Sequence, residues 1–466
     1  MGKSRLKGKD LRKINYRSNQ AISVAIDVMQ KHGKHWSKQE KLDLLSDVLL
    51  HPEKYLDHAF LDAVAHCFVE VLEQENFTKY QLTAPKPVQV FGKKFIDQNT
   101  LNQMDVVSQL PIAVQGALMP DAHVGYGLPI GGVLATKNEV VPYAIGLDIA
   151  CRMSLTIFDD AVTEMSRRSH QFKMALKEHT HFGIGNQQDE STDHFVFDDE
   201  RFQATEVLRT LKGKAMKQIG TSGSGNHFVE FGEVVLEENN QLNLPAGHYL
   251  GLLSHSGSRG FGAAIANYYT RVAIDQCKLP TGAQHLAWLD LNSEAGQEYW
   301  LSMELAGDYA KACHDVIHQK LTKSLGLKAL VNVENHHNFA WKERLNGEEL
   351  IVHRKGATPA QEGVLGIIPG SMMHPGYIVS GKGNPLSINS AAHGAGRKMS
   401  RKKAKESLTG SEMKKQLKAN KITLIGGGVD ESPMVYKNIE EVMKGQKELV
   451  EVQGKFFPRI VRMDKK

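Results

Sequence analysis

The spacing of apolar residues and the glycine content of the sequence change at about residue 88, and this change most constrains the fold. Before it, apolar residues recur at helical spacing, and Ser37 to Glu40 form a capping pattern ahead of an apolar run. After it, glycine becomes dense and polar residues fall inside short apolar stretches, which is typical of a mixed α/β enzyme with functional loops. We therefore expect an α/β (α+β) fold, with a small α-helical extension over residues 1–80 and a single catalytic domain over residues 88–466.

Local patterns predict individual elements. We expect residues 1–15 to be flexible, and we read residues 82–92, with Pro85 and Pro87, as a linker or an edge strand. Periodicity and breakers predict helices over residues 19–31, 37–50, 57–75, 97–108, 164–178, 202–218, 262–276, 294–324 and 401–418.

Charge is unevenly distributed along the chain, whose net charge is +5. Basic residues concentrate in residues 1–17 and 397–421, which suggests a polyanionic partner, with nucleic acid first. The alternative is a disordered tail and a solvated helix face. No apolar run approaches a membrane span, and the basic N-terminus has no apolar core, so it is not a secretory signal. Four cysteines without paired spacing favour a reducing compartment, and we expect a cytoplasmic protein.

Several blocks bring together side chains that bind metal ions. Asp148 and Cys151 lie three residues apart among apolar neighbours that would bury them. A buried carboxylate and a buried thiol are energetically costly unless they are paired or bound to a metal. Three loops rich in glycine or amides each deliver a histidine, and a thiolate can bridge two ions. Taken singly, each residue is more often a cap or a satisfied core residue. Together, three to four loop histidines and the carboxylate and thiol form an N/O/S donor set that suits zinc, manganese or a similar divalent ion. The candidates are Asp148, Cys151, His227, His255 and the pair His336 and His337.

A basic turn near the C-terminus carries the candidate nucleophile. His393 precedes two glycines and then Arg397 and Arg401. Glycines let backbone N–H groups approach an anion, arginines bind phosphate through two parallel hydrogen bonds, and a neutral imidazole can carry a phosphoryl group. Alone, the same residues also fit a structural turn with a basic surface. Neither a Walker A motif nor a kinase signature is present in the sequence.

Read in order, these blocks resemble the RtcB RNA ligases, which join RNA ends using GTP. The resemblance covers about four fifths of the chain, from about residue 87 to the end. It rests on PDAH (120–123), GLDIAC (146–151), GNHFVE (225–230), HSGSRG (255–260), HHN (336–338), PGSM (369–372), HGAGR with MSR (393–401), and DESP with YK (430–437).

The resemblance implies a fold and a set of residue roles. The fold would be a single α/β catalytic domain with a deep metal-lined pocket. By this resemblance, two Mn²⁺ ions bridged by Cys151 would be bound by Asp148, Cys151, His227, His255 and His337, and His393 would take GMP. The nucleotide contacts would be Asn226, Glu230, Ser371 and Lys437, with the turn Gly394, Ala395 and Gly396, and the RNA phosphates would meet Arg259, Arg397 and Arg401.

The implied reaction joins a 3′-phosphate or 2′,3′-cyclic phosphate RNA end to a 5′-hydroxyl end, in RNA repair or tRNA splicing. A cyclic phosphate is first hydrolysed, His393 is then guanylylated, the RNA 3′-phosphate takes the GMP, and the 5′-hydroxyl displaces it. RNA is the expected partner; DNA and membranes are not. The need for an activating protein and the oligomeric state stay open.

Departures from the family pattern define the alternative. Arg152 stands where a glycine is typical, Tyr126 where a lysine is common, and Met373 and His374 where a glycine and a small residue are usual. The alternative is a metal-dependent cyclic phosphodiesterase or RNA-end-binding protein with weak or no sealing.

Overall fold

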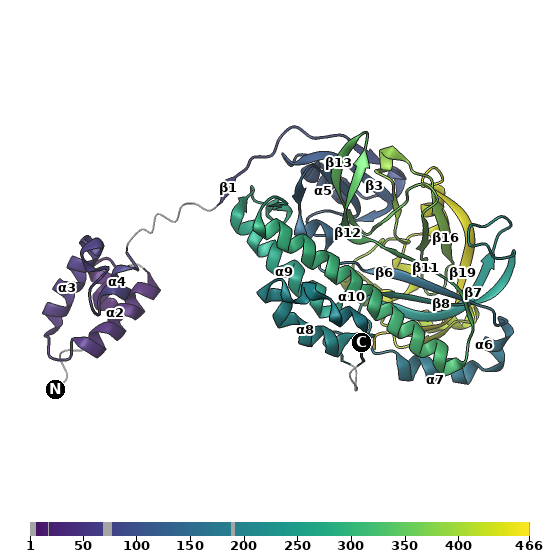
Figure 1. Ribbon diagram of the computed structural model, residues 1–466, viewed down its shortest axis with the longest axis horizontal. Coiled ribbons are helices and arrows are strands. Elements are labelled where there is room, and N and C mark those ends of the chain that lie inside the picture. The colour runs from purple at the N-terminus through teal and green to yellow at the C-terminus, as the bar shows by residue number, and fades with distance from the viewer. Residues whose placement is uncertain (1–5, 17, 69–76, 188–191, 466) are drawn as a thin grey trace. The chain divides into compact units, whose positions relative to one another are not determined.

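The chain divides into two compact units, residues 1–76 and 77–466 (Figure 1). The computed structural model describes residues 6–16, 18–68, 77–187 and 192–465. No helix in these ranges is both long enough and apolar enough to span a membrane.

The smaller unit is helical, as the sequence predicts. It contains α1 (Gly8–Lys13), α2 (Asn19–His32), α3 (Lys38–Leu50), a 3₁₀ turn (Pro52–Tyr55) and α4 (Asp62–Ala65). Ser37 and Glu40 form the expected capping box at the start of α3.

Two predictions about this unit were wrong. Residues 6–15 are not a flexible tail, because Leu6 and Leu11 are buried in the core of the unit and Asp10 pairs with Lys38 at 2.8 Å. The helix predicted over residues 57–75 is only the four-residue α4 within the described part, and residues 69–76 lie outside it.

The larger unit is built around an eight-stranded sheet that nearly closes on itself. Its order is β11-β6-β8-β7-β19-β16-β15, with β18 paired to β19. Asn335 at the end of β11 bonds through its side chain to both the N–H and the C=O of Ile367 in β15, so the first and last strands meet. The strands are β6 (Arg152–Phe158), β7 (Phe228–Leu236), β8 (Gly247–Ser256), β11 (Ala329–His336), β15 (Leu365–Ile368), β16 (Gly376–Gly381), β18 (Thr423–Ile425) and β19 (Val450–Met463).

A five-stranded sheet in the order β12-β13-β4-β3-β2 stands beside it. β2 is an edge strand, as one of the two readings of residues 82–92 predicts. The strands are β2 (Val88–Val90), β3 (Ala113–His123), β4 (Ile130–Thr136), β12 (Asn338–Leu345) and β13 (Glu348–Lys355). Short pairs are β1 (Thr78–Lys79) with β9 (Cys277–Lys278), β5 (Glu139–Val140) with β10 (Leu289–Asp290), and β14 (Ala357–Pro359) with β17 (Ser390–Ala392).

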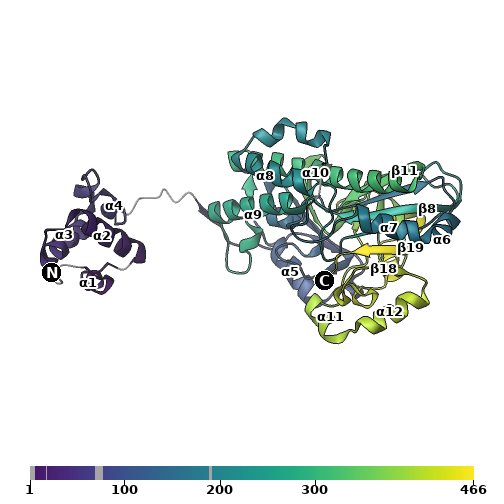
Figure 2. The same ribbon diagram turned by 90° about the horizontal axis from the view of Figure 1, so that it is seen from below.

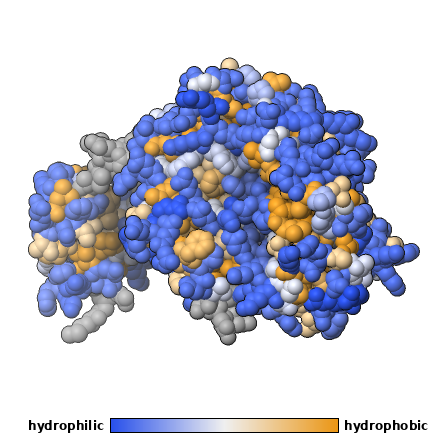
Figure 3. Space-filling view, turned by 45° about the vertical axis from the view of Figure 1, so that its right-hand side comes forward, coloured by the Kyte–Doolittle hydropathy of each residue, from blue (hydrophilic) through white to orange (hydrophobic). Residues whose placement is uncertain are grey.

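Helices cover the sheets and carry the basic segment. α10 (Glu294–Leu325) crosses the large sheet, and α11 (Arg401–Ser407) and α12 (Gly410–Ala419) lie beside β18, away from α8 and α10 (Figure 2). The remaining helices are α5 (Gln98–Ser108), α6 (Thr163–Arg167), α7 (Ser169–His179), α8 (Glu206–Gln218), α9 (Arg259–Gln276) and α13 (Ile439–Lys444). The described surface in Figure 3 is mostly hydrophilic with separate hydrophobic patches.

The mixed α/β class expected from the sequence is confirmed. The predicted metal donors lie at one end of neighbouring strands. Cys151 precedes β6, His227 precedes β7, His255 is next to last in β8, and His337 follows β11. Antiparallel neighbours alternate direction, so two strand starts and two strand ends meet at the same edge.

Candidate active site

A cavity of about 1090 Å³ lies at this edge of the large sheet. The residues predicted from the sequence that line it are Asn226, Glu230, His255, His337, Ser371, His393, Gly394, Ala395, Gly396, Arg397, Arg401 and Lys437.

The five predicted metal donors form two groups that share one thiol. Asp148, Cys151 and His227 make one group, and Cys151, His255 and His337 make the other. Cys151 Sγ lies 3.4 Å from Nε2 of His227 and 3.2 Å from Nε2 of His255. Nε2 atoms of His255 and His337 are 3.3 Å apart, and Nε2 of His227 is 3.0 Å from Asp148 Oδ2.

These separations fit bound divalent ions. Donors around one tetrahedral ion with bonds of about 2.1 Å lie roughly 3.4 Å apart. Nδ1 of His255 lies 3.0 Å from the carbonyl of Asn226, which fixes the ring so that Nε2 faces the cluster. The cluster therefore has the donor types and the spacing to hold divalent ions, and Cys151 belongs to both of its groups.

Two glycines of the sequence blocks make room for this cluster. A Cβ on Gly257 would lie 2.2 Å from Asp148 Oδ1, and a Cβ on Gly223 would lie 1.9 Å from Nδ1 of His227. Any side chain at either position would displace a donor, so the loops must approach the donors as bare backbone.

Burial sets the protonation states in the cluster. It lowers the pKa of His255 to about 3 and that of His337 well below its usual value, which keeps both rings neutral, the form that binds metal. Burial opposes ionisation of Asp148, yet the hydrogen bond and charge of His227 hold its pKa below the usual range. Burial also raises the pKa of the Cys151 thiol, so the thiolate needs a cation beside it.

Asp121 orients the predicted nucleophile. Its Oδ2 accepts a hydrogen bond from Nδ1 of His393 at 2.7 Å and from the backbone N–H groups of His393 and Gly394 at 3.2 and 3.3 Å. With the proton on Nδ1, Nε2 of His393 carries a lone pair. The centre of the His393 ring lies 4.9 Å from that of His337, which places the imidazole beside a member of the metal-donor cluster.

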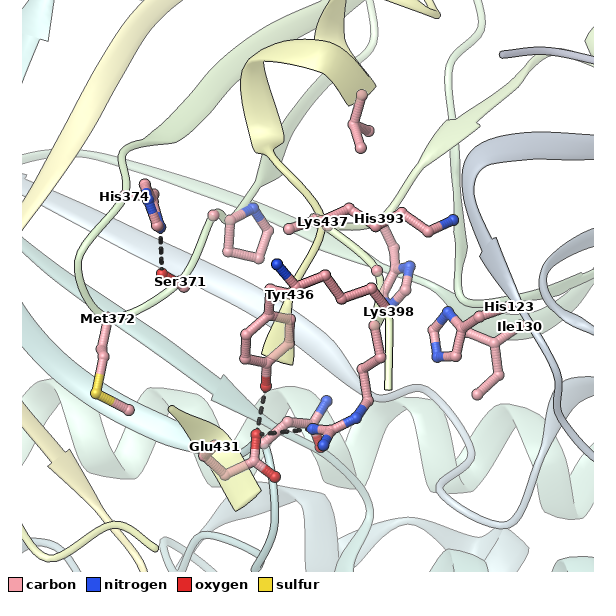
Figure 4. Close-up of a pocket in the computed structure, with 18 of the residues that line it drawn as sticks. His123, Ile130, Ser371, Met372, His374, His393, Lys398, Glu431, Tyr436 and Lys437 are labelled. Atoms are coloured by element: carbon pink, nitrogen blue, oxygen red, sulfur yellow. Dashed lines mark hydrogen bonds and ion pairs between the residues drawn. The ribbon is translucent and has the colours of Figure 1, made fainter. Parts of the chain in front are cut away.

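Two of the predicted phosphate-binding arginines are already paired. Arg397 contacts Glu431 at 3.4 Å and the carbonyl of Asp430 at 2.8 Å. Arg401 contacts Asp430 at 3.2 Å and also pairs with Glu431, which accepts a hydrogen bond from Tyr436 as well (Figure 4). Asp430 and Glu431 are buried, so the cavity wall carries nearly balanced charge here.

The remaining predicted residues occupy different positions. Glu230 is buried, and burial raises its pKa well above the usual value. Lys437 donates to the carbonyls of Pro120 and Ala122 at 3.3 and 2.7 Å, which places it beside Asp121. Arg259 is outside the cavity lining, where it donates to Thr221 Oγ1 and the carbonyl of Gly183 at 3.0 and 2.8 Å.

Comparison with known proteins identifies the family. Residues 103–464 match the family model described as tRNA-splicing ligase RtcB. The chain belongs to the RtcB family. The RNA-splicing ligase RtcB of Escherichia coli K12 is 31% identical over 402 residues, covering 79% of this chain and 95% of that protein.

Relatives from archaea match over a similar span. The tRNA-splicing ligase RtcB of Nanoarchaeum equitans is 30% identical over 458 residues, covering 81% of this chain and 96% of that protein. The one from Thermococcus kodakarensis is 27% identical over 423 residues, with coverages of 76% and 88%. The resemblance noted in the sequence is thus confirmed, and the chain is an enzyme of an RNA-ligase family.

The structure accommodates the residues that depart from the RtcB pattern. Arg152 is buried and pairs with Glu334 at 3.3 Å. Tyr126 lines the cavity with its side chain 74% exposed. His374 also lines the cavity, and its Nδ1 lies 2.7 Å from Ser371 Oγ (Figure 4).

Sequence reasoning missed four residues of this RtcB-family site. Asp121 and His123 belong to the PDAH block, and Glu431 and Tyr436 to the DESP and YK block, but the sequence analysis gave none of them a role. Burial lowers the pKa of His123 to about 4, so a further neutral imidazole lines the cavity in addition to those of His255 and His337. An acidic residue two positions before a histidine was the available signal for Asp121.

Proposed function

We propose that this chain is a GTP- and Mn²⁺-dependent RNA ligase. It joins RNA ends that carry a 3′-phosphate or a 2′,3′-cyclic phosphate to ends that carry a 5′-hydroxyl, through guanylylated His393. The supporting observation is the placement of His393: Asp121 holds its Nδ1, and its ring lies 4.9 Å from a member of the metal-donor cluster.

A 2′,3′-cyclic phosphate end is first opened to a 3′-phosphate, as water adds to the phosphorus and the bond to the 2′-oxygen breaks. Guanylylation then uses the lone pair on Nε2 of His393. It attacks the α-phosphorus of GTP, an N–P bond forms, and the P–O bond to pyrophosphate breaks. Asp121 stabilises the positive charge that develops on the imidazole through the Nδ1 hydrogen bond. Divalent ions held by Asp148, Cys151, His227, His255 and His337 would supply charge neutralisation for the phosphates.

The later steps return His393 to its starting state. An oxygen of the RNA 3′-phosphate attacks the guanylyl phosphorus, and the N–P bond breaks. The 5′-hydroxyl oxygen then attacks the RNA phosphorus and loses its proton, and GMP leaves as the new phosphodiester forms. Arg397 and Arg401 are the side chains of the cavity wall suited to hold these phosphates.

Buried polar groups suit a guanine nucleotide. Hydrogen bonds from guanine N1 and N2 would favour the carboxylate form of Glu230, whose ionisation burial opposes. Asn226, Ser371 and Lys437, with the turn from Gly394 to Gly396, complete the proposed nucleotide contacts. A reducing compartment such as the cytoplasm would keep Cys151 available as a metal ligand.

A joining assay tests the proposal. Two RNA fragments, one ending in a cyclic phosphate and the other beginning with a 5′-hydroxyl, are incubated with protein, Mn²⁺ and GTP. The joined product is expected with the wild type and with His248→Ala, an exposed histidine outside the site, but not with His393→Ala. Opening of the cyclic phosphate without joining in the wild type would instead establish the phosphodiesterase reading.

A further inference from the structure

A second groove lies next to the active-site cavity on the larger unit. Its volume is about 470 Å³, and four lysines stand among its lining residues. The lining comprises Tyr377, Lys382, Glu440, Met443, Lys444, Lys447, Val450, Glu451, Val452 and Lys455. None of these residues belongs to the proposed catalytic machinery.

The groove and the cavity share two walls. On α13, Glu441 and Val442 line the cavity, whereas Glu440 and Lys444 line the groove. On β16, Gly376 lines the cavity and the next residue lines the groove. The cavity and the groove are therefore separated by only α13 and β16.

The lysines of the groove are free to bind an anion. Within the described residues, none of the four forms an ion pair with a carboxylate. Lys382 donates to the carbonyl of Lys447 at 2.8 Å, and the Nζ of Lys455 lies 5.5 Å from the centre of the Tyr377 ring. Both contacts position the ammonium groups without neutralising them. The two glutamates of the lining leave a net charge of +2.

The floor of the groove is apolar and the exposed rim is basic. Tyr377, Met443 and Val450 are buried, whereas Lys444 and Lys447 are exposed at the rim. Flexible ammonium groups along a groove suit a repeating polyanion that is bound through its backbone, because they act as point charges without base readout.

We propose that this groove binds the phosphodiester backbone of the RNA strand whose end occupies the active-site cavity. The inference rests on the proposed function for the identity of the polyanion. The groove holds the body of the strand, and the cavity holds its terminal phosphate.

The experiment removes the two exposed rim lysines from the full chain. Lys444→Gln/Lys447→Gln is compared with the wild type by fluorescence anisotropy, using an RNA of about 12 nucleotides with a 3′-phosphate. The Kd is expected to rise roughly tenfold at physiological salt, and the slope of log Kd against log salt to fall by about 1.4, since two contacts are lost. A dinucleotide with a 3′-phosphate should bind both proteins equally, because it is too short to leave the cavity.

Two controls isolate the groove. Lys444→Arg/Lys447→Arg retains the charge and should bind like the wild type, and Lys177→Gln/Lys217→Gln removes two exposed lysines on α7 and α8 with little effect. Transfer of label from GTP to the protein needs no RNA and should be unchanged in every variant. An unchanged Kd and salt slope in the glutamine variant, or an equal loss in the α7 and α8 control, would overturn the proposal. A wild type that binds RNA through the groove but takes no label from GTP would contradict the proposed function alone.

Discussion

The metal-donor cluster and the arginine pair lie in the same site, but their charges are balanced in opposite ways. The cluster gathers a buried thiol, a carboxylate and three imidazoles, and among the residues that the structure describes Nδ1 of both His227 and His337 has no hydrogen-bond partner. Arg397 and Arg401, in contrast, are paired with the buried carboxylates of Asp430 and Glu431. The cluster requires cations from outside the chain, whereas the arginine pair carries its own counter-charge.

This difference separates two uses of buried polar groups. The donor atoms of the cluster face one another, and a cation bound among them would replace those contacts. Arginines held by carboxylates are instead pre-oriented, and a phosphate must share or replace those carboxylates to bind them. We therefore expect variants of the cluster to alter metal binding and variants of the arginine pair to alter folding stability.

The largest effect is expected at the shared thiol. Cys151→Ala removes a donor from both groups, so Mn²⁺ affinity should fall more than roughly 100-fold at both positions. His337→Ala removes a donor from one group only, so one Mn²⁺ should stay bound. Equilibrium dialysis with metal analysis measures this, and equal losses in the two variants would contradict a bridging thiol.

Asp121→Asn should slow guanylylation by about 10²- to 10⁴-fold, because the amide no longer fixes the Nδ1 proton of His393 or stabilises its positive charge. Bound Mn²⁺ should be unchanged, since Asp121 is in neither donor group. The rate of label transfer from GTP, measured beside the metal content, checks both statements. Parallel loss of metal would show that Asp121 acts through the cluster instead.

Glu431→Gln should lower the free energy of unfolding by roughly 3 kcal/mol, since it removes the buried counter-charge of two arginines. Cys151→Ala in metal-free protein should change it by about 1 kcal/mol or less, because only a small side chain is lost. Urea unfolding of both variants without metal gives the comparison. The reverse order of effects would mean that the cluster, and not the arginine pair, is stabilised from within.

His353 is a buried histidine whose two ring nitrogens both have hydrogen-bond partners, in contrast to His227 and His337, whose Nδ1 atoms have none within the described part of the chain. Its Nε2 accepts the N–H of Val141 at 2.9 Å and Nδ1 lies 3.2 Å from the carbonyl of Leu134, and burial lowers its pKa to about 4. Only the unfolded chain takes up this proton between its usual pKa and about 4. The contribution of neutral His353 to folding stability is therefore complete above pH 6.5 and is lost as the pH falls from 6.5 towards about 4.

The expected loss from His353 is about 1 kcal/mol by roughly pH 5.5. Urea unfolding at several pH values should show a shallower acid decline for His353→Gln than for the wild type. Identical slopes for the two proteins would remove His353 from the account.

Local patterns predicted the fold class and most of the helices because each depends on neighbouring residues. Within the described chain, the helix predicted over 401–418 is divided into α11 and α12, since Thr409 caps a new helix. The prediction of a helix over residues 57–75 was also wrong in its described part. Several residues of 57–68 pack into the core of the small unit, and most of this segment forms turns instead of a continuous helix. The buried helix α1 was missed because a basic segment with only two buried leucines has the composition of a flexible tail.

Chemistry grouped the thiol, the carboxylate and the loop histidines as candidate metal donors, and the structure brings five of these side chains together. The pairing of Asp121 with His393 could not be predicted, since the two residues lie 272 positions apart and no local pattern joins them. The pairing of Arg397 and Arg401 with Asp430 and Glu431 likewise depends on how the C-terminal loops fold together.

The most direct test of the central claim is a map of the covalent nucleotide. The protein is incubated with Mn²⁺ and GTP labelled on the α-phosphate, and the label is located by peptide analysis under conditions that preserve an N–P bond. We predict an acid-labile label on His393 in the wild type and no label in His393→Ala. A stable label on another residue, or an unlabelled wild type with both metal positions filled, would contradict the account.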